Sequence, residues 1–193
     1  MAKSLLQMLS LTHINKTWTL FLDRDGVIND EKHMDYIHNW EEFIFIPGVK
    51  EAIKIFGEVF GQIFVVTNQR GVGKGVTKLE DLKIIHKNML REITEAGGRI
   101  DAIYFCTDVE EASPNRKPNP GMGLLAKKEF PKVDFSKAIM IGNTLSDMEF
   151  GRRLGVKTIL LPSDSREINQ EDDRIDAVYE SLISFAKTLE GNL

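Results

Sequence analysis

Two aspartates separated by one residue follow a short apolar segment. In FLDRDGVIND, residues 21–30, Asp23 and Asp25 come directly after the run Trp18–Leu22. Residues two apart in an extended chain point to the same side, so both carboxylates can reach one substrate. Such a pair suits one carboxylate as nucleophile and the other as proton donor, with a magnesium ion offsetting their repulsion. The alternative is a polar strand end that enters a turn, and the pair alone does not decide.

Three further polar segments follow apolar runs. Thr67 and Asn68 begin TNQRGVGKG, where a hydroxyl and backbone amides could hold phosphate oxygens. The spacing is not that of a Walker A loop, which disfavours nucleotide binding. Arg116 and Lys117 lie in NRKPNPGM, whose prolines could hold a cation rigidly near a phosphate. The last segment is IMIGNTLSDM. Taken singly, TNQRGVGKG could equally be the exit of a strand into a loop, and NRKPNPGM could equally be a basic surface loop.

An alternation of apolar runs and helical patterns is expected to bring these segments together. The expected strands are Trp18–Leu22, Ile63–Thr67, Ala102–Cys106, Ala138–Ile141 and Thr158–Leu161. The expected helices are Val49–Phe60, Leu79–Ala96, Pro120–Glu129, Asp147–Leu154 and one near Ala177–Leu189. Thr77 and Glu80 have the spacing of a capping box for the second helix. The pattern predicts an α/β fold with a doubly wound, Rossmann-like parallel sheet, and ligands bind beyond the carboxyl ends of such strands.

The length of 193 residues is typical of one domain. We expect an N-terminal arm over residues 1–17 and a single domain over 18–190, without a large cap domain. Residues 29–46 interrupt the alternation of strands and helices and are rich in aromatic and charged side chains. We call this segment the flap. It could cover a site and contact substrate through Tyr36 and His38, or Trp40 and Phe43 could simply pack against the core.

Composition excludes several classes of function. The formal net charge is -4, the pI is near 5.6 and charges of both signs are interspersed, which disfavours nucleic-acid partners. No segment approaches the roughly 20 apolar residues of a membrane helix. The only cysteine, Cys106, excludes an intramolecular disulfide and fits a reducing compartment. These properties predict a cytoplasmic protein, with a monomer favoured, that acts on a small molecule.

The order of the four polar segments resembles the haloacid dehalogenase-like (HAD-like) phosphohydrolases. Asp23 and Asp25 match the first motif of that family, Thr67 the second, Lys117 the third and GNTLSDM the acidic fourth. More narrowly, FLDRDGVIN, YIHNWEEFIFIPGV, VVTNQRGVGKG and RKPNPGM are similar to the histidinol-phosphate and heptose-bisphosphate phosphatase branch. The resemblance covers roughly residues 19–155.

The resemblance implies a magnesium-dependent phosphomonoesterase that works through an aspartyl-phosphate. Asp23 would attack phosphorus, and Asp25 would protonate the leaving alcohol and then activate water. Asp25 would also offer its backbone carbonyl to the metal. Thr67 and Lys117 would hold the phosphoryl oxygens, and Arg116 would contact substrate near its phosphate.

The sequence departs from the family pattern at two places. Asn143 stands where the fourth motif commonly has its first acid, although Asp147 follows four residues later. The expected metal ligands are therefore Asp23, Asp25, Asn143 and Asp147. An amide oxygen can ligate magnesium but adds no charge. In addition, Cys106 has no nearby cysteine or histidine partner, so the zinc loop of many branch members is not expected.

Three functions remain open. The favoured one is a phosphatase acting on a small phosphate ester such as heptose bisphosphate or histidinol phosphate. The second is a nucleic-acid 3'-phosphatase, since the phosphatase domain of polynucleotide kinase has similar motifs. The third is a non-catalytic phosphate-binding domain, which Asn143 would make possible.

Overall fold

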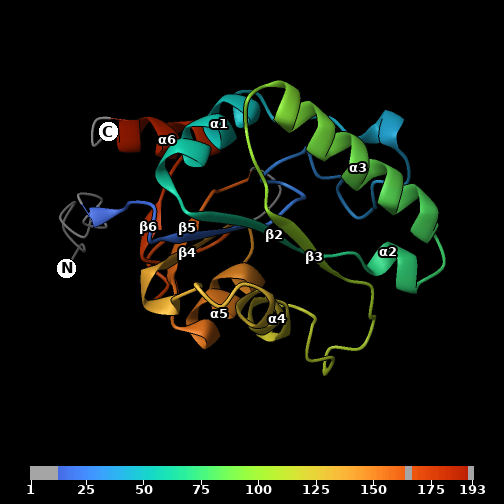
Figure 1. The fold of residues 1–193 in the computed structure, drawn as a ribbon. Coiled ribbons are helices and arrows are strands. Elements are labelled where there is room, and N and C mark those ends of the chain that lie inside the picture. Colours follow the sequence, from blue (N-terminus) through green and yellow to red (C-terminus); the bar gives the residue numbers. More distant parts are fainter. Residues whose placement is uncertain (1–12, 164–166, 191–193) are drawn as a thin grey trace.

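Six parallel strands form one sheet in the computed structural model, which describes residues 13–163 and 167–190. The strands are β1 (Thr19–Leu22), β2 (Gln62–Asn68), β3 (Ala102–Cys106), β4 (Ala138–Gly142), β5 (Lys157–Leu160) and β6 (Ala177–Val178). Their order across the sheet is β3-β2-β1-β4-β5-β6 (Figure 1). The chain builds outward from β1 in one direction and from β4 in the other. This reversal creates a topological switch point between the carboxyl ends of β1 and β4.

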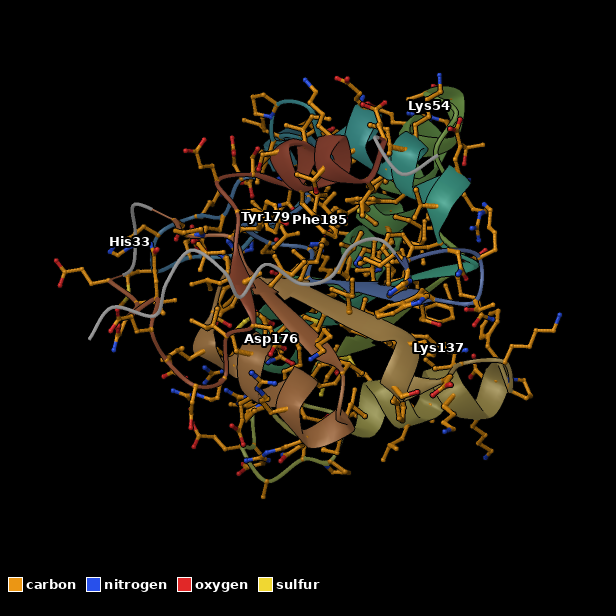
Figure 2. The ribbon with its side chains drawn as sticks, turned by 90° about the vertical axis from the view of Figure 1, so that its left-hand side faces the viewer. His33, Lys54, Lys137, Asp176, Tyr179 and Phe185 are labelled. Atoms are coloured by element: carbon orange, nitrogen blue, oxygen red, sulfur yellow. The ribbon has the colours of Figure 1, made fainter. Side chains whose placement is uncertain are left out.

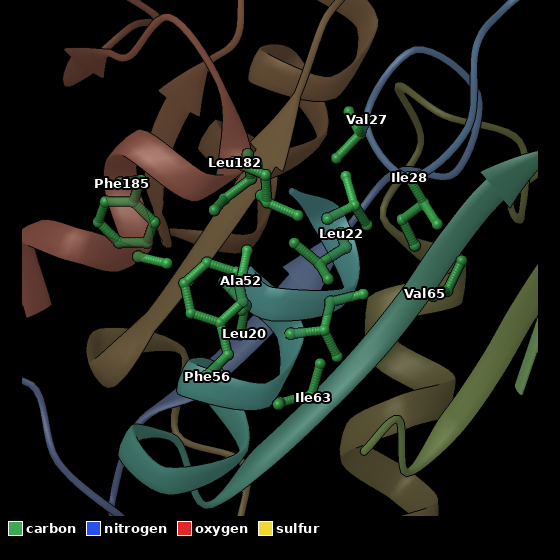
Figure 3. Close-up of a cluster of buried hydrophobic side chains, with 14 of the residues drawn as sticks. Leu20, Leu22, Val27, Ile28, Ala52, Phe56, Ile63, Val65, Leu182 and Phe185 are labelled. Carbon is green, nitrogen blue, oxygen red and sulfur yellow. The ribbon is translucent and has the colours of Figure 1, made fainter. Parts of the chain in front are cut away.

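The sheet is buried on both faces because its strands carry apolar side chains at consecutive positions. Leu20 and Leu22 belong to one core cluster, and Phe21 between them belongs to a second cluster on the opposite face. The first face is covered by α1 (Val49–Val59), α3 (Leu79–Glu95) and α6 (Leu182–Glu190), and the second by α4 (Gly121–Glu129) and α5 (Leu145–Leu154) (Figure 1). Figure 3 shows Phe56 of α1 and Phe185 of α6 in the first cluster. The predicted doubly wound α/β fold is confirmed.

The carboxyl-terminal part of the chain differs from the prediction of one helix near Ala177–Leu189. Ala177–Val178 is strand β6, and α6 begins only at Leu182. Asp176 fixes the start of this strand because its carboxylate accepts a hydrogen bond from Thr158 N at 2.9 Å. Tyr179 and Phe185 then lie next to each other where the chain enters the helix, with ring centroids 5.0 Å apart (Figure 2). A strand of two residues has no periodicity that a sequence pattern could reveal.

The predicted capping box at Thr77 is wrong. Helix α3 follows Lys78 without a side-chain cap, and Thr77 Oγ1 instead lies 2.8 Å from His38 Nδ1 in the flap. A capping box is instead present at α5, which begins at Leu145 rather than at Asp147. The glycine-rich segment after β2 is also more regular than expected, because it holds a short helix, α2 (Arg70–Gly73).

The described part of the expected N-terminal arm contacts the rest of the molecule. Ile14 is buried in the first core cluster, and Lys16 Nζ donates to the backbone oxygen of Gly57 at 2.6 Å. Residues 1–12 of the expected arm lie outside the described residues. We propose that residues 13–17 belong to the same domain as the sheet. Among the described residues, no helix is long and apolar enough to cross a membrane.

Replacing Phe56 with alanine should strongly destabilise the fold. The side chain is fully buried, and its ring centroid lies 5.6 Å from that of Phe185 and 5.8 Å from that of Phe60. Removing a phenyl ring from such a core costs about 3–5 kcal/mol. Urea unfolding monitored by circular dichroism measures the change. The control Ile84→Ala, at a half-exposed position on α3, should change the free energy of unfolding by less than about 1 kcal/mol. Equal effects of the two substitutions would contradict the described packing.

Candidate active site

A cavity of about 660 Å³ lies at the carboxyl ends of the strands. Every site residue predicted from the sequence lines it: Asp23, Asp25, Thr67, Asn68, Arg116, Lys117, Asn143 and Asp147. They come from the ends of β1, β2 and β4, from the first turn of α5 and from the loop between β3 and α4. The prediction that the four polar segments meet at one edge of the sheet is therefore confirmed.

A buried lysine connects two buried carboxylates at the centre of the cavity. Lys117 Nζ lies 2.8 Å from Asp23 Oδ1 and 2.5 Å from Asp147 Oδ1. Burial alone would lower the pKa of Lys117, but the charges of Asp147 and Asp23 outweigh it and raise this pKa. Burial, together with the charge of Asp147, raises the pKa of Asp23 to about 7. The network therefore keeps a cation beside Asp23, while two carboxylates share that single cation.

The turn between β4 and α5 fixes the position of Asp147. Its Oδ2 accepts hydrogen bonds from Thr144 N at 3.0 Å and from Thr144 Oγ1 at 2.6 Å, and Thr144 in turn caps the helix. The Asp147 side chain also packs directly on Gly142, where an added Cβ would lie 2.2 Å from Asp147 Cβ. Only glycine leaves room for the carboxylate at this point. One oxygen of Asp147 thus belongs to the helix cap, and the other faces Lys117.

Asn143 has a buried side chain whose polar atoms lack hydrogen-bond partners. Neither Oδ1 nor Nδ2 is paired among the described residues, and only 1% of the residue is exposed. The amide lies close to Gly26, where a Cβ would be 1.9 Å from Asn143 Nδ2 and where φ is +77°. An unpaired buried amide is costly, and a cation beside its oxygen would remove the part of that cost that is due to the oxygen. This oxygen is therefore available to ligate a metal ion.

The nearby donors fit magnesium. The Asn143 oxygen and the carboxylates of Asp23 and Asp147 are all hard oxygen ligands of the kind that magnesium prefers. The family resemblance adds the backbone carbonyl of Asp25. Within residues 13–163 and 167–190 no group of three or more histidine, cysteine, aspartate or glutamate side chains is arranged to hold a metal. A metal at this place therefore needs the Asn143 amide or backbone oxygens in addition to carboxylates.

Asp25 is held by an arginine that the sequence analysis did not identify. Arg24 Nη2 donates to the two carboxylate oxygens of Asp25 at 2.7 and 2.9 Å. Asn29 and Gln69 donate two further hydrogen bonds, at 3.0 and 2.8 Å. Burial raises the pKa of Asp25, but Arg24 and these donors outweigh burial and lower it. The carboxylate is therefore ionised and fixed in direction.

Arg24 is itself locked in place. Its side chain is fully buried, its guanidinium carbon lies 5.9 Å from the centroid of the Phe43 ring, and Nη1 lies 3.3 Å from His86 Nε2. Burial and the charge of Arg24 lower the pKa of His86 to about 3, so this histidine is neutral. The arginine between the two aspartates was the available sequence signal for this arrangement. Its partners Phe43 and His86 are distant in sequence and could not have been paired with it.

The ends of β2 and of the loop after β3 are tied together. Asn68 Oδ1 accepts from Lys117 N at 3.0 Å, and Asn68 Nδ2 donates to Lys117 O at 3.0 Å. Asn68 therefore braces the backbone of Lys117 in addition to lining the cavity. Thr67 Oγ1 accepts a hydrogen bond from Gln69 Nε2 at 2.9 Å. Arg116, predicted to contact substrate, donates from Nη1 to the backbone oxygen of Val109 while still lining the cavity.

The structure confirms one of the two roles that the sequence left open for the flap. Phe43 is buried, and its ring centroid lies 5.1 Å from that of Trp40, so these aromatic residues pack against the core. Tyr36 and Ile37 instead line a second cavity of about 430 Å³, which shares Asp25 with the first. The packing prediction holds for one part of the flap. Whether the other part contacts substrate stays a prediction.

Comparison with known proteins identifies relatives over most of the chain. A family model described as HAD-hydrolase-like matches residues 114–185. D-glycero-alpha-D-manno-heptose-1,7-bisphosphate 7-phosphatase of Mycobacterium bovis is 34% identical over 170 residues, which are 88% of this chain and 90% of that protein. The protein of the same name from Campylobacter jejuni is 38% identical over 152 residues, covering 79% of this chain and 86% of that one.

A solved structure has the same fold. The D,D-heptose 1,7-bisphosphate phosphatase of B. bronchiseptica, crystallised with magnesium and phosphate, matches with a TM-score of 0.82 and 26% identity. The match covers 91% of this chain and 99% of that chain. The resemblance noted in the sequence is thus confirmed over nearly the whole length of these relatives. The chain belongs to the HAD-like hydrolases and, among them, to the D-glycero-D-manno-heptose-1,7-bisphosphate 7-phosphatase family.

Proposed function

We propose that this phosphatase removes the 7-phosphate of D-glycero-D-manno-heptose 1,7-bisphosphate in a magnesium-dependent reaction through a phosphorylated Asp23. The observation that carries the proposal is the buried network of Asp23, Lys117 and Asp147 beside the unpaired oxygen of Asn143. In support of the proposal, a carboxylate that could act as nucleophile, a fixed cation and several oxygen atoms suited to magnesium line one cavity. The relatives that share most of the chain act, by their names, on this bisphosphate.

The first half of the reaction transfers the phosphoryl group to the protein. An Asp23 oxygen attacks phosphorus, and the bond from phosphorus to the sugar oxygen breaks. Lys117 and Thr67 hold the phosphoryl oxygens during the transfer. Asp25 gives a proton to the leaving sugar oxygen. Because Asp25 is ionised in the free site, it must first take up a proton, and the negative charge of a bound phosphate ester beside it favours this uptake.

The second half releases phosphate. Water attacks the phosphorus of the aspartyl-phosphate while Asp25, now ionised, accepts a proton from it, and the bond to Asp23 breaks. Arg24 keeps Asp25 in one orientation through both steps. Magnesium, held by Asp23, Asn143, Asp147 and the backbone carbonyl of Asp25, would supply positive charge against the phosphoryl oxygens.

The two other functions have less support. A nucleic-acid 3'-phosphatase would need a positive surface for the phosphate backbone, and the net charge of the chain is -4. A non-catalytic domain would not need a nucleophile, a lysine and a metal-binding oxygen placed together. We further infer a cytoplasmic location, which the single cysteine supports, and a monomer.

A panel of substrates tests the proposal. With magnesium, the purified protein should release phosphate from D-glycero-D-manno-heptose 1,7-bisphosphate with a higher kcat/KM than from histidinol phosphate or a 3'-phosphorylated oligonucleotide. Asp23→Asn should lower kcat by at least about 10⁴-fold, since it removes the nucleophile. Asp134→Asn, the same change at an exposed position before β4, should keep the wild-type rate. Preference for the oligonucleotide, or normal turnover by a folded Asp23→Asn protein, would refute the proposal.

Substitutions at the β4–α5 turn test the metal site. Asn143→Asp restores a negative charge and should lower the magnesium concentration for half-maximal activity by about fivefold, as expected for roughly 1 kcal/mol of added attraction. Asp147→Asn should severely reduce activity, because it removes a proposed ligand and a partner of Lys117. Magnesium titrations of phosphate release, with thermal unfolding as a check on the fold, measure both effects. An unchanged metal requirement in Asn143→Asp and full activity in Asp147→Asn would exclude this turn as the metal site.

A further inference from the structure

The loop between β3 and α4, residues 107–120, carries Lys117 but buries few of its other side chains. It extends away from the sheet before it returns to α4 (Figure 1). Its exposed residues are Asp108, Glu110, Glu111, Ala112 and Pro114. Exposed side chains add little hydrophobic stabilisation, so the conformation of this loop depends mainly on hydrogen bonds.

The side chain of Asn119 ties the two halves of this loop together. Its Nδ2 donates to Glu111 O at 2.9 Å and to Ser113 O at 2.8 Å, which uses both amide protons. Asn119 N donates to Arg116 O at 2.8 Å and so closes the turn that contains Lys117. One residue therefore joins the turn that carries the buried lysine to the exposed part of the loop.

The oxygen of the same amide is bound to α5. Arg153 Nη1 donates to Asn119 Oδ1 at 2.7 Å, and Arg153 Nε donates to Glu149 Oε1 at 2.8 Å, which fixes the direction of the guanidinium. Helix α5 also presents Asp147, whose carboxylate contacts Lys117. Asn119 thus connects the loop that carries the cation to the helix that carries one of its two anionic partners.

The contacts of Lys117 tolerate little displacement of its backbone. Its Nζ lies 2.8 Å from Asp23 Oδ1 and 2.5 Å from Asp147 Oδ1, and a shift of about 1 Å would break such hydrogen bonds. Asn68 braces the backbone of Lys117 from β2, and Asn119 braces the turn from the other side. Asn119 also lines the cavity, but both of its amide protons are already bound to the loop.

We propose that Asn119 is a positioning residue, which fixes the β3–α4 loop to α5 and thereby keeps Lys117 between Asp23 and Asp147. It acts through Lys117 and makes no contact with the reacting atoms. An effect of Asn119 on turnover rests on the proposed function, because it requires Lys117 to hold the phosphoryl oxygens. An effect on the mobility of the loop does not require this, so the two can be measured separately.

Hydrogen–deuterium exchange of the full-length protein tests the brace without any substrate. Asn119→Ala should raise the exchange rates of the hydrogen-bonded backbone amides of Ser113, Arg116 and Lys117 by about fivefold or more, as expected for the net loss of at least one hydrogen bond. Asn88→Ala, the same change at a half-buried position of α3, should leave these rates unchanged. Unchanged rates in Asn119→Ala would overturn the proposal.

Turnover of D-glycero-D-manno-heptose 1,7-bisphosphate with magnesium tests the positioning of Lys117. Asn119→Ala should lower kcat by on the order of tenfold to a hundredfold and change KM less, because a small misplacement of a group that acts in the transition state is costly. Asn119→Asp keeps the acceptor for Arg153 but cannot donate to the loop, so its kcat should also fall. Arg153→Ala should lower kcat less, and adding it to Asn119→Ala should cause no further loss.

A stability control separates positioning from a general loss of folding. Tyr104→Phe removes the hydrogen bond that Tyr104 Oη donates to Glu129 at 2.8 Å between β3 and α4, and it should lower Tm but keep the wild-type kcat. Raised exchange with an unchanged kcat in Asn119→Ala would overturn the positioning role and leave the proposed function intact. A wild-type protein that is inactive on the bisphosphate would overturn the proposed function, and the exchange rates alone would then decide whether Asn119 holds the loop. Raised exchange together with the loss of kcat supports the proposal.

Discussion

The contact of Lys117 with two buried carboxylates is the interaction on which the site depends. Removing an ammonium and two carboxylates from water is unfavourable, and the chain offsets this only by holding the three groups within ion-pair distance. That requirement explains several features around them. Gly142 leaves room for Asp147, Thr144 fixes one of its oxygens in a helix cap, and Asn68 braces the backbone of Lys117. The surroundings are arranged so that one cation faces two anions.

This network also explains the place of magnesium in the proposed reaction. Asp23 and Asp147 together carry more negative charge than Lys117 neutralises, and the unpaired oxygen of Asn143 lies in the same cavity. A divalent cation would more than offset this excess of negative charge and would also satisfy that oxygen. With Asn143 in place of an acid, the local negative charge is lower by one, but the side-chain oxygen that could ligate the metal is kept. The departure from the family motif is thus compatible with catalysis.

Residues that follow the strands directly could be placed from sequence, whereas contacts between distant segments could not. Asp23, Thr67 and Asn143 come after buried apolar runs, and the meeting of parallel strand ends at one edge brings them together. The clamp of Arg24 on Asp25 depends on Phe43 and His86, which lie on the flap and on α3. Thr77 had the spacing of a helix cap, but a flap histidine competes for its hydroxyl. In such cases a tertiary partner overrides a local pattern.

The two hydrogen bonds between Asn68 and the backbone of Lys117 have a mechanical consequence. They join the end of β2 to the loop after β3, because the Asn68 side chain bonds to both the backbone nitrogen and the backbone oxygen of Lys117. Thr67 and Lys117, the two proposed phosphate-binding residues, are thereby carried on a single rigid unit although 49 residues separate Asn68 from Lys117 in the chain. Thermal motion then displaces the hydroxyl and the ammonium together, so the spacing between them is preserved while the unit as a whole moves.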